Sequence, residues 1–273
     1  MPELPEVEST ANRLRDGRPP EPALLGKTIA RAEVYWPRTV ATPAPRAFRQ
    51  RIAGQKVMAI GRRAKFIVIT LSQDTLIIHL RMSGDVLVAK EAKPAGRFTR
   101  LALWFTDGWQ LAFDDARKFG RMWLVDDPDS VLGGLGPEPL DAALTPATFH
   151  ALLAARGRAL KPLLLDQAFI AGIGNIYADE SLHLARLHPL TRANSLTKDQ
   201  AAALLKAIRK VLRAGIRRNG ASIDWVYRGG GYQNEFRVYQ RTDEPCMNCG
   251  TPVRRITVGQ RGTHFCPTCQ PTP

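Results

Sequence analysis

The sequence predicts an α+β chain of several domains, in which an N-terminal helix and a β-sandwich precede a helical region and a C-terminal cysteine module. Three observations predict this order. Short segments rich in Val, Ile, Leu and aromatic residues follow one another between residues 28 and 125, as in a β-sandwich or flattened barrel. After the glycine-rich stretch 133–136, apolar residues recur at helical spacing. All four cysteines lie near the end of the chain, in two closely spaced pairs.

The composition is that of a strongly basic globular protein. Hydrophobic residues make up 44% of the 273 residues, which is enough for a substantial core. Lys and Arg outnumber Asp and Glu by 39 to 25, giving a net charge of +14. Such a surface attracts polyanions, with nucleic acid as the first candidate, although ribosomal and RNA-binding proteins share this property. The sequence shows no apolar run of membrane length and no signal peptide, so we expect a cytoplasmic protein without membrane contacts.

The first expected element is an amphipathic helix. Leu4, Val7, Ala11 and Leu14 recur at the spacing of one helical face. The chain opens with Met-Pro-Glu-Leu-Pro-Glu-Val-Glu, and a proline followed by glutamates in the first turn is an ordinary helix start. The segment 16–20, with one glycine and two prolines, ends the helix.

The same N-terminal residues also permit covalent chemistry. Methionine is usually removed before a small residue, so loss of Met1 would leave the secondary amine of Pro2 at the start of the chain. An α-amine titrates near pH ~8. Its attack on an aldehyde-level carbon gives a cationic iminium, which is a good electron sink. Glu3 and Glu6 lie one helical turn apart and could face the same site as an acid and a positioning group.

The β-sandwich is expected from eight apolar segments that are separated by turns such as Ser83-Gly84 and Asp107-Gly108. These segments are 28–36, 55–60, 65–71, 75–80, 85–89, 100–105, 110–113 and 122–125. One short helix, around 47–52, interrupts them.

The helical region is expected to contain four helices. The first begins at residue 146, the second and third span 160–166 and 175–187, and the fourth extends from residue 198 to about residue 218. Thr145 is an N-cap before a proline at the first helical position, Pro146. Thr197 with Gln200 makes a capping box for the last helix.

The cysteine spacing predicts one structural zinc ion. The four cysteines are spaced as Cys246-x2-Cys249-x16-Cys266-x2-Cys269, so that two tight turns can present four thiolates tetrahedrally. The alternative is two disulfides, which an intracellular chain disfavours. Four cysteine ligands leave no open position for water, so His264 is not expected to be a ligand. Arg261 and its neighbouring arginines between the two pairs would either touch phosphate or form a solvated surface.

Several motifs resemble those of the formamidopyrimidine-DNA glycosylases, bacterial enzymes that excise oxidised purines. The motifs are Met1–Glu8, His79–Gly84, Asp115–Gly120, Gly172–Tyr177 and the cysteine module, in the family's order. The resemblance implies a catalytic β-sandwich domain over 1–132, a helical helix–two-turn–helix DNA-binding domain over 133–240, and a C-terminal zinc ribbon over 241–273.

The resemblance also implies a function. The chain would be a monomeric, bifunctional base-excision-repair enzyme of the bacterial cytoplasm and nucleoid that acts on damaged double-stranded DNA. It would remove 8-oxoguanine and formamidopyrimidines through an imine at Pro2 and cleave the abasic site by β,δ-elimination. Glu3 would protonate the deoxyribose ring oxygen, Glu6 would position the terminus, and Lys65 would bind the phosphate next to the lesion.

Five further residues match the family's DNA contacts. His79 and Asn175 would contact the DNA backbone, whereas Met82 and Phe119 would be wedges that hold the extruded base's neighbours apart. Arg117 would fill the void, where its guanidinium favours the two adjacent acceptors of cytosine. Without the resemblance, a strand-end histidine, a helix-opening glycine turn and a buried Met and Phe would each be ordinary structural features.

Two other functions stay open at this point. An endonuclease VIII-like glycosylase shares the architecture but prefers oxidised pyrimidines; Leu4 and the segment 117–119 favour the purine enzyme. A zinc-ribbon protein that binds DNA without catalysis would not need a free N-terminus. A glycine-rich loop at 228–232 would close over the extruded base in the enzyme.

Overall fold

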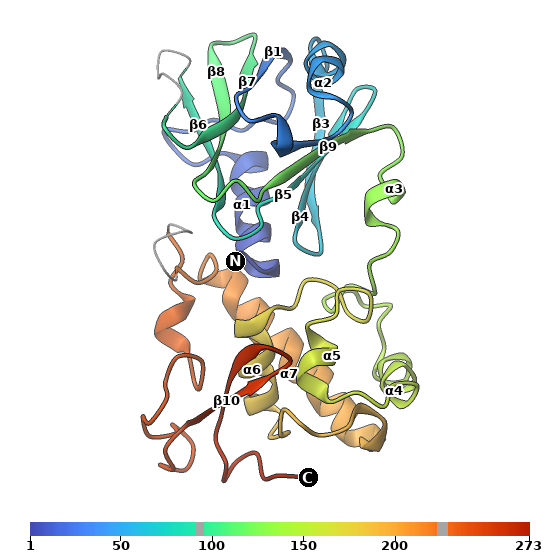
Figure 1. Cartoon of the computed structure of the whole chain (residues 1–273), viewed down its shortest axis with the longest axis vertical. Helices are drawn as coiled ribbons and strands as arrows, with labels where there is room; N and C mark the ends of the chain where they lie inside the picture. The colour runs from blue at the N-terminus through green and yellow to red at the C-terminus, as the bar shows by residue number, and fades with distance from the viewer. Residues whose placement is uncertain (91–95, 223–228) are drawn as a thin grey trace. The chain divides into compact units, whose positions relative to one another are not determined.

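The structure is a computed structural model of the whole chain, and it describes residues 1–90, 96–222 and 229–273 (Figure 1). The fold is mixed α and β, as predicted. In this described part of the chain, no helix combines the length and the apolar character that crossing a bilayer requires.

The contacts divide the chain into two compact units. Unit 1 holds Met1–Gly134, and unit 2 holds Leu135–Ala221 and Gly230–Pro273. The finer division into three domains, with boundaries at 132/133 and 240/241, stays a prediction.

Unit 1 contains two β-sheets, which confirm the predicted sandwich. The first sheet has the order β1 (Ile29–Val34), β7 (Thr99–Phe105), β8 (Trp109–Asp115), β6 (Gly84–Lys90). The second has the order β2 (Val40–Thr42), β9 (Arg121–Val125), β5 (Thr75–His79), β4 (Phe66–Leu71), β3 (Val57–Arg63). The eight predicted strands are present, with ends that differ by at most three residues. Strand β2 was not predicted, because so short a segment shows no alternating pattern.

The N-terminal helix α1 (Leu4–Asp16) packs against β3 and β4. Its predicted apolar face is confirmed, because Leu4, Val7, Ala11 and Leu14 are at most 1% exposed. The helix ends at Gly17, whose φ of 78° is readily adopted only by glycine. The other elements of unit 1 are the 3-10 helix η1 (Pro37–Thr39), the predicted helix α2 (Pro45–Ile52) and a short helix α3 (Asp129–Leu132), which was not predicted.

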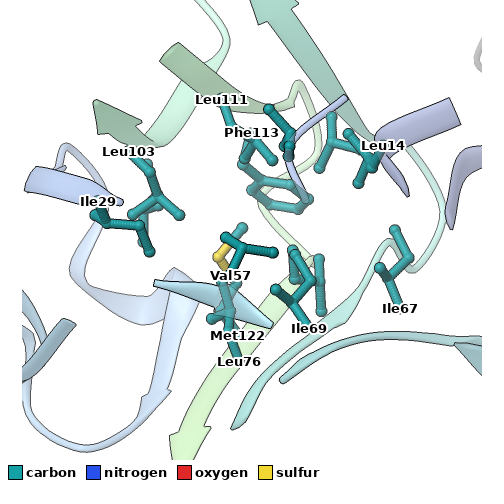
Figure 2. Close-up of a cluster of buried hydrophobic side chains, with 14 of the residues drawn as sticks. Leu14, Ile29, Val57, Ile67, Ile69, Leu76, Leu103, Leu111, Phe113 and Met122 are labelled. Atoms are coloured by element: carbon teal, nitrogen blue, oxygen red, sulfur yellow. The ribbon is translucent and has the colours of Figure 1, made fainter. Parts of the chain in front are cut away.

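The core of unit 1 lies between the two sheets and α1 (Figure 2). Side chains from both sheets meet there, among them Ile29, Leu103, Leu111 and Phe113 from the first and Ile67, Ile69, Leu76 and Met122 from the second. Burying each such side chain stabilises the fold by about 1.5–3 kcal/mol. This packing fixes the strand ends, and the loops between these ends carry four of the predicted site residues: Lys65, Met82, Arg117 and Phe119.

Unit 2 is mainly helical, as predicted. Its helices are α4 (Pro146–Ala154), α5 (Leu160–Leu164), α6 (Asn175–Leu184) and α7 (Lys198–Arg217), with the 3-10 helices η2 (Ala193–Ser195) and η3 (Tyr232–Glu235). Both predicted caps are confirmed. Thr145 Oγ1 accepts a hydrogen bond from the N–H of Thr148 at 3.1 Å, and Thr197 and Gln200 form the capping box.

Helices α5 and α6 end two and three residues earlier than predicted. After α5, the Asp166 carboxylate accepts a hydrogen bond from the N–H of Ala168 at 3.1 Å and stabilises a turn. After α6, Arg186 adopts a φ of 56°, a left-handed conformation that ends a right-handed helix.

The cysteine module contains an antiparallel hairpin formed by β10 (Arg254–Val258) and β11 (Arg261–Phe265). The hairpin is fastened to α6 through Asp179, which is 1% exposed. The carboxylate of Asp179 pairs with Lys161 Nζ at 2.5 Å and accepts a hydrogen bond from the N–H of His264 at 2.9 Å. Helix α5, helix α6 and the hairpin therefore share one buried ionic centre.

The next residue of α6, Glu180, fastens the segment that leads into the cysteine module. Its carboxylate accepts hydrogen bonds from the N–H groups of Arg237, Val238 and Tyr239 at 2.9–3.1 Å. Burial raises the pKa of Glu180, whereas these N–H groups lower it.

The Lys161–Asp179 pair yields a test of this packing. Replacement Lys161→Met leaves a buried carboxylate without its cation, so we expect unit 2 to lose about 3–5 kcal/mol of stability. Urea denaturation followed by circular dichroism at a helical wavelength measures the loss. The matched control is Arg158→Gln, which removes an exposed ion pair to Asp166 and should cost about 0–1 kcal/mol. Equal losses in the two variants would contradict the structural role of the buried pair.

Candidate active site and nucleic-acid interface

The two predicted acidic residues at the N-terminus form a capping box. The N–H of Glu3 donates to Glu6 Oε2 at 2.8 Å, and the Glu3 carboxylate accepts from the N–H of Glu6. Glu3 and Glu6 are only 3% and 2% exposed, and Pro2 is buried beside them, whereas Met1 is 48% exposed. The structure therefore holds two carboxylates in fixed positions directly after Pro2, at the positive end of α1.

Lys65 lies in the turn between β3 and β4 and is 5% exposed. The preceding residue, Ala64, has a φ of 52°, so the backbone turns sharply there. Arg62 Nε, just before the turn, pairs with the carboxylate of Glu8 on α1 at 2.7 Å. This ion pair ties the turn that carries Lys65 to the first half of the helix that follows Pro2.

His79 is held in one tautomer at the end of β5. Its Nδ1 accepts a hydrogen bond from the N–H of Arg81 at 2.9 Å, so Nε2 carries the proton. Phe66 packs edge-on against the ring at 4.6 Å between centroids. Burial, together with the charges of Arg81 and Lys65, lowers the pKa of His79 to about 3. The ring is therefore neutral at physiological pH and can donate one hydrogen bond from Nε2, for example to a phosphate oxygen.

Asp115 connects the loop that carries Met82 to the loop that carries Arg117 and Phe119. Its side chain is 1% exposed and accepts hydrogen bonds from Ser83 Oγ, from the N–H of Arg117 at 3.1 Å and from the N–H of Gly120 at 2.7 Å. A Cβ atom at Gly120 would overlap the Phe113 ring, so glycine is required there. The buried carboxylate thus closes the loop 116–120 and fixes it to the β5–β6 loop.

The three predicted DNA-distorting residues are accessible on these two loops. Phe119 is 49% exposed, Arg117 is exposed, and Met82 is half-buried. The Arg117 guanidinium lies 5.0 Å from the centroid of the Phe119 ring. The alternative interpretation, a core residue of the sandwich, is wrong for Phe119, and Met82 does not belong to the buried core cluster of unit 1. Exposed apolar side chains next to an arginine are instead suited to contact a partner.

The glycine turn that precedes α6 is buried. Gly172 has a φ of 87°, and its N–H donates to the Gln167 side chain at 2.9 Å. Gly174 is the N-cap of α6, and Asn175 is the first residue of this helix. Asn175 Nδ2 donates to the carbonyl of Gly262 in the hairpin at 3.0 Å, which places Asn175 beside the loop end that carries Arg261.

The cysteine side chains cluster as a metal site requires. The four Sγ atoms of Cys246, Cys249, Cys266 and Cys269 lie within 4.8 Å of one another. The separations Cys246–Cys269 and Cys249–Cys266 are 3.9 and 3.4 Å, far longer than a disulfide bond. They are close to the ~3.8 Å between sulfurs in a tetrahedron with Zn–S bonds of about 2.3 Å. The four thiols therefore fit one tetrahedral metal ion, and His264 is engaged with Asp179 instead.

Several contacts were missed by sequence reasoning. Asp115 and Ser83 lie inside the motifs Asp115–Gly120 and His79–Gly84, but in the sequence they resemble ordinary turn residues. Lys161 and Asp179 resemble solvent-exposed helix positions. The signal that distinguishes them is their burial, which depends on distant segments. The predicted loop at 228–232 begins at a residue outside the described ones, and its role stays a prediction.

The comparisons with known proteins cover nearly the whole chain. Residues 1–122 match the family model of the formamidopyrimidine-DNA glycosylase N-terminal domain, residues 135–226 that of the formamidopyrimidine-DNA glycosylase H2TH domain, and residues 243–272 that of the zinc finger found in FPG and IleRS. The formamidopyrimidine-DNA glycosylase of Chloroflexus aggregans is 48% identical over 99% of this chain and 98% of its own length.

Solved structures agree with this similarity. The complex of Lactococcus lactis Fpg (MutM) with DNA containing N7-benzyl-Fapy-dG has a TM-score of 0.91 and is 35% identical, covering 99% of this chain and 100% of that one. A MutM complex with DNA containing carbocyclic 8-oxo-G has a TM-score of 0.90 and is 36% identical, with the same coverage.

The state of His79 can be tested directly. We expect long-range ¹H–¹⁵N spectra to show the Nε2–H tautomer from neutral pH down to pH 5, because the pKa lies near 3 rather than 6.5. The unfolded chain takes up this proton near pH 6.5, so below that pH the group lowers the stability of unit 1. The loss is at most about 1.4 kcal/mol per pH unit down to about pH 3. His79→Gln should reduce the pH dependence of the stability of unit 1 over this range. A ring that protonates near pH 6.5 would contradict the assignment.

Proposed function

Because this chain belongs to the formamidopyrimidine-DNA glycosylase family, we propose that it excises oxidised purines from duplex DNA through an imine formed at Pro2. It is a DNA glycosylase of base-excision repair, with the lyase activity of that family. The observation that carries the proposal is the pair of buried carboxylates, Glu3 and Glu6, directly after Pro2. The family match favours purine lesions over the pyrimidine lesions of endonuclease VIII-like enzymes.

The proposed reaction begins with removal of Met1, which converts the amide nitrogen of Pro2 into a secondary amine. This amine attacks C1′ of the damaged nucleotide while Glu3 protonates the ring oxygen of the deoxyribose. The bond from C1′ to the base breaks, and the base leaves with the electron pair and takes up a proton from solvent. The attached nitrogen loses its proton, and its lone pair expels the protonated ring oxygen, so that the C1′–O4′ bond breaks and the sugar ring opens. The resulting iminium acidifies the hydrogen at C2′, so that loss of this proton expels the 3′ phosphate, and a second elimination expels the 5′ phosphate.

Glu6 has a positioning role in this scheme. Its carboxylate accepts the N–H of Glu3, so the backbone next to Pro2 cannot rotate freely. A fixed nucleophile and a fixed acid lower the entropic part of the barrier. Lys65, in the turn tied to α1, would hold the phosphate next to the lesion.

Access to the damaged base requires its extrusion from the duplex. Phe119 and Met82 would enter the stack as wedges, and Arg117 would donate to N3 and O2 of the unpaired cytosine. The loop closed by Asp115 presents these side chains with little conformational freedom. His79, Asn175 and Arg261 would hold the DNA backbone.

The cysteine module would hold one structural Zn²⁺. Four thiolates complete a tetrahedral shell, so the ion would stabilise the hairpin and supply no open coordination position. The hairpin carries Arg261 and contacts Asn175 through Gly262, so the metal would act on DNA binding by fixing these two groups. We further propose that the protein acts as a monomer in the bacterial cytoplasm, at the nucleoid.

The imine can be trapped chemically. Protein without Met1 is mixed with duplex DNA containing 8-oxoguanine opposite cytosine, and borohydride is added. We expect a covalent adduct that peptide mapping assigns to Pro2. Glu3→Gln should slow base excision about 100-fold or more, because an amide cannot donate the proton, yet its oxygen can still accept the capping hydrogen bond. This variant should still form the adduct with abasic-site DNA, because that substrate has already lost its base.

The control is the same protein with an N-terminal tag, which blocks the amine and should abolish the adduct without unfolding unit 1. If protein shown by mass spectrometry to lack Met1 binds the DNA but forms no adduct, the imine mechanism is wrong. An adduct only with oxidised pyrimidines would reject the proposed substrate class.

The metal has a separate test. Elemental analysis should find one zinc per chain, and Cys269→Ser should lower this content and weaken DNA binding. We expect unit 1 to keep its stability in this variant, because the ligands belong to unit 2. Full zinc occupancy in Cys269→Ser would contradict the four-cysteine site.

A further inference from the structure

A groove on unit 2 lies outside the candidate site. It has a volume of about 420 Å³ and lies between the start of α4 and one face of α7. Its apolar lining comes from Pro146, Ala202 and Leu205. None of the residues to which we assign catalysis or DNA contacts lies in its lining.

Besides Arg209, four basic side chains of α7 line the groove: Lys206, Lys210, Arg213 and Arg217. Their spacing of four, three and four residues places them on one face of the helix, over a length of about 16 Å. Within the described ranges, none of them forms an ion pair or a side-chain hydrogen bond. Cations one turn apart repel each other, and no carboxylate of the described chain forms an ion pair with these four.

The groove has a fixed wall because Arg209 fastens the segment before α4 to α7. Its Nε donates to the carbonyl of Pro139 at 2.8 Å, and its Nη2 donates to the carbonyls of Asp141 and Leu144 at 2.7 Å. A cavity that is already formed requires little ordering when a ligand enters.

We propose that this groove binds an acidic peptide segment of a partner protein that carries an apolar side chain. The carboxylates would pair with the cations, and the apolar side chain would enter between Pro146, Ala202 and Leu205. About five residues of extended chain match the length of the basic row. A DNA backbone would satisfy the cations but would leave the apolar lining without a partner, so the lining favours a peptide. The proposal does not depend on the chemistry at Pro2.

The test uses a fluorescein-labelled peptide of four alternating Asp and Glu residues followed by one phenylalanine, and fluorescence polarisation with the whole protein. We expect saturable binding that weakens with added salt. The double variant Lys210→Gln/Arg213→Gln should weaken binding about fivefold or more. Ala202→Phe should block it by filling the apolar lining while all cations are kept. Circular dichroism checks that both variants are folded.

The matched control is Arg156→Gln/Lys198→Gln, which removes the same charge from exposed positions outside the groove and should leave peptide binding unchanged. Excision of 8-oxoguanine should be unchanged in all these variants. Equal binding of a peptide with alanine in place of phenylalanine would overturn the proposal, because the groove would then attract any polyanion. If Lys210→Gln/Arg213→Gln weakens the binding of undamaged duplex DNA as strongly as it weakens the binding of the peptide, the surface binds nucleic acid and the proposal is also wrong.

Discussion

The hydrogen bonds of the buried Asp115 carboxylate are the constraint on which the candidate interface of unit 1 depends. The loop that we propose to enter a duplex exposes an apolar side chain, and exposure of apolar surface to water is unfavourable. Asp115 fixes the loop 116–120 in the conformation that exposes Phe119, by accepting from Ser83 Oγ and from the N–H groups of Arg117 and Gly120. These hydrogen bonds offset the cost of exposing Phe119. Asp115 can make them because the end of β8 is fixed by the packing of Phe113 in the core of the sandwich.

Unit 2 uses the same kind of interaction for a different purpose. Asp179 and Glu180 are neighbours on α6, and both are 1% exposed. Buried carboxylates are costly unless they are paired. Asp179 is paired with Lys161 and His264 and so binds the hairpin, whereas Glu180 accepts from backbone N–H groups of the segment that leads into the cysteine module. A small module of this kind has a limited core of its own, and such ionic contacts fix its orientation on the helices.

How much of this could be predicted depends on the sequence distance of the interactions. The caps at Thr145 and Thr197 and the cysteine spacing depend on residues close in sequence, so they could be recognised directly. Asp115 and Asp179 could not, because their partners Ser83 and His264 lie 32 and 85 residues away. Strand β2 was missed for a related reason, since it exists only through its pairing with β9. The proposed roles of Lys65, His79 and Asn175 came from the family resemblance, and the structure adds the contacts that orient His79 and Asn175.

The N-terminus shows why a local pattern can support two interpretations at once. A helix start needs acceptors for its first N–H groups, and the Glu3–Glu6 capping box supplies them. The proposed reaction needs an acid beside the amine of Pro2, which Glu3 would supply, and a group that positions the terminus, which Glu6 would supply. The burial of the two carboxylates distinguishes the catalytic interpretation from simple helix capping. A cap functions equally well at the surface, whereas here both carboxylates are almost fully buried although Met1 is half exposed. Burial of carboxylates costs free energy that capping does not require, and a desolvated acid next to a nucleophile is what the proposed chemistry requires.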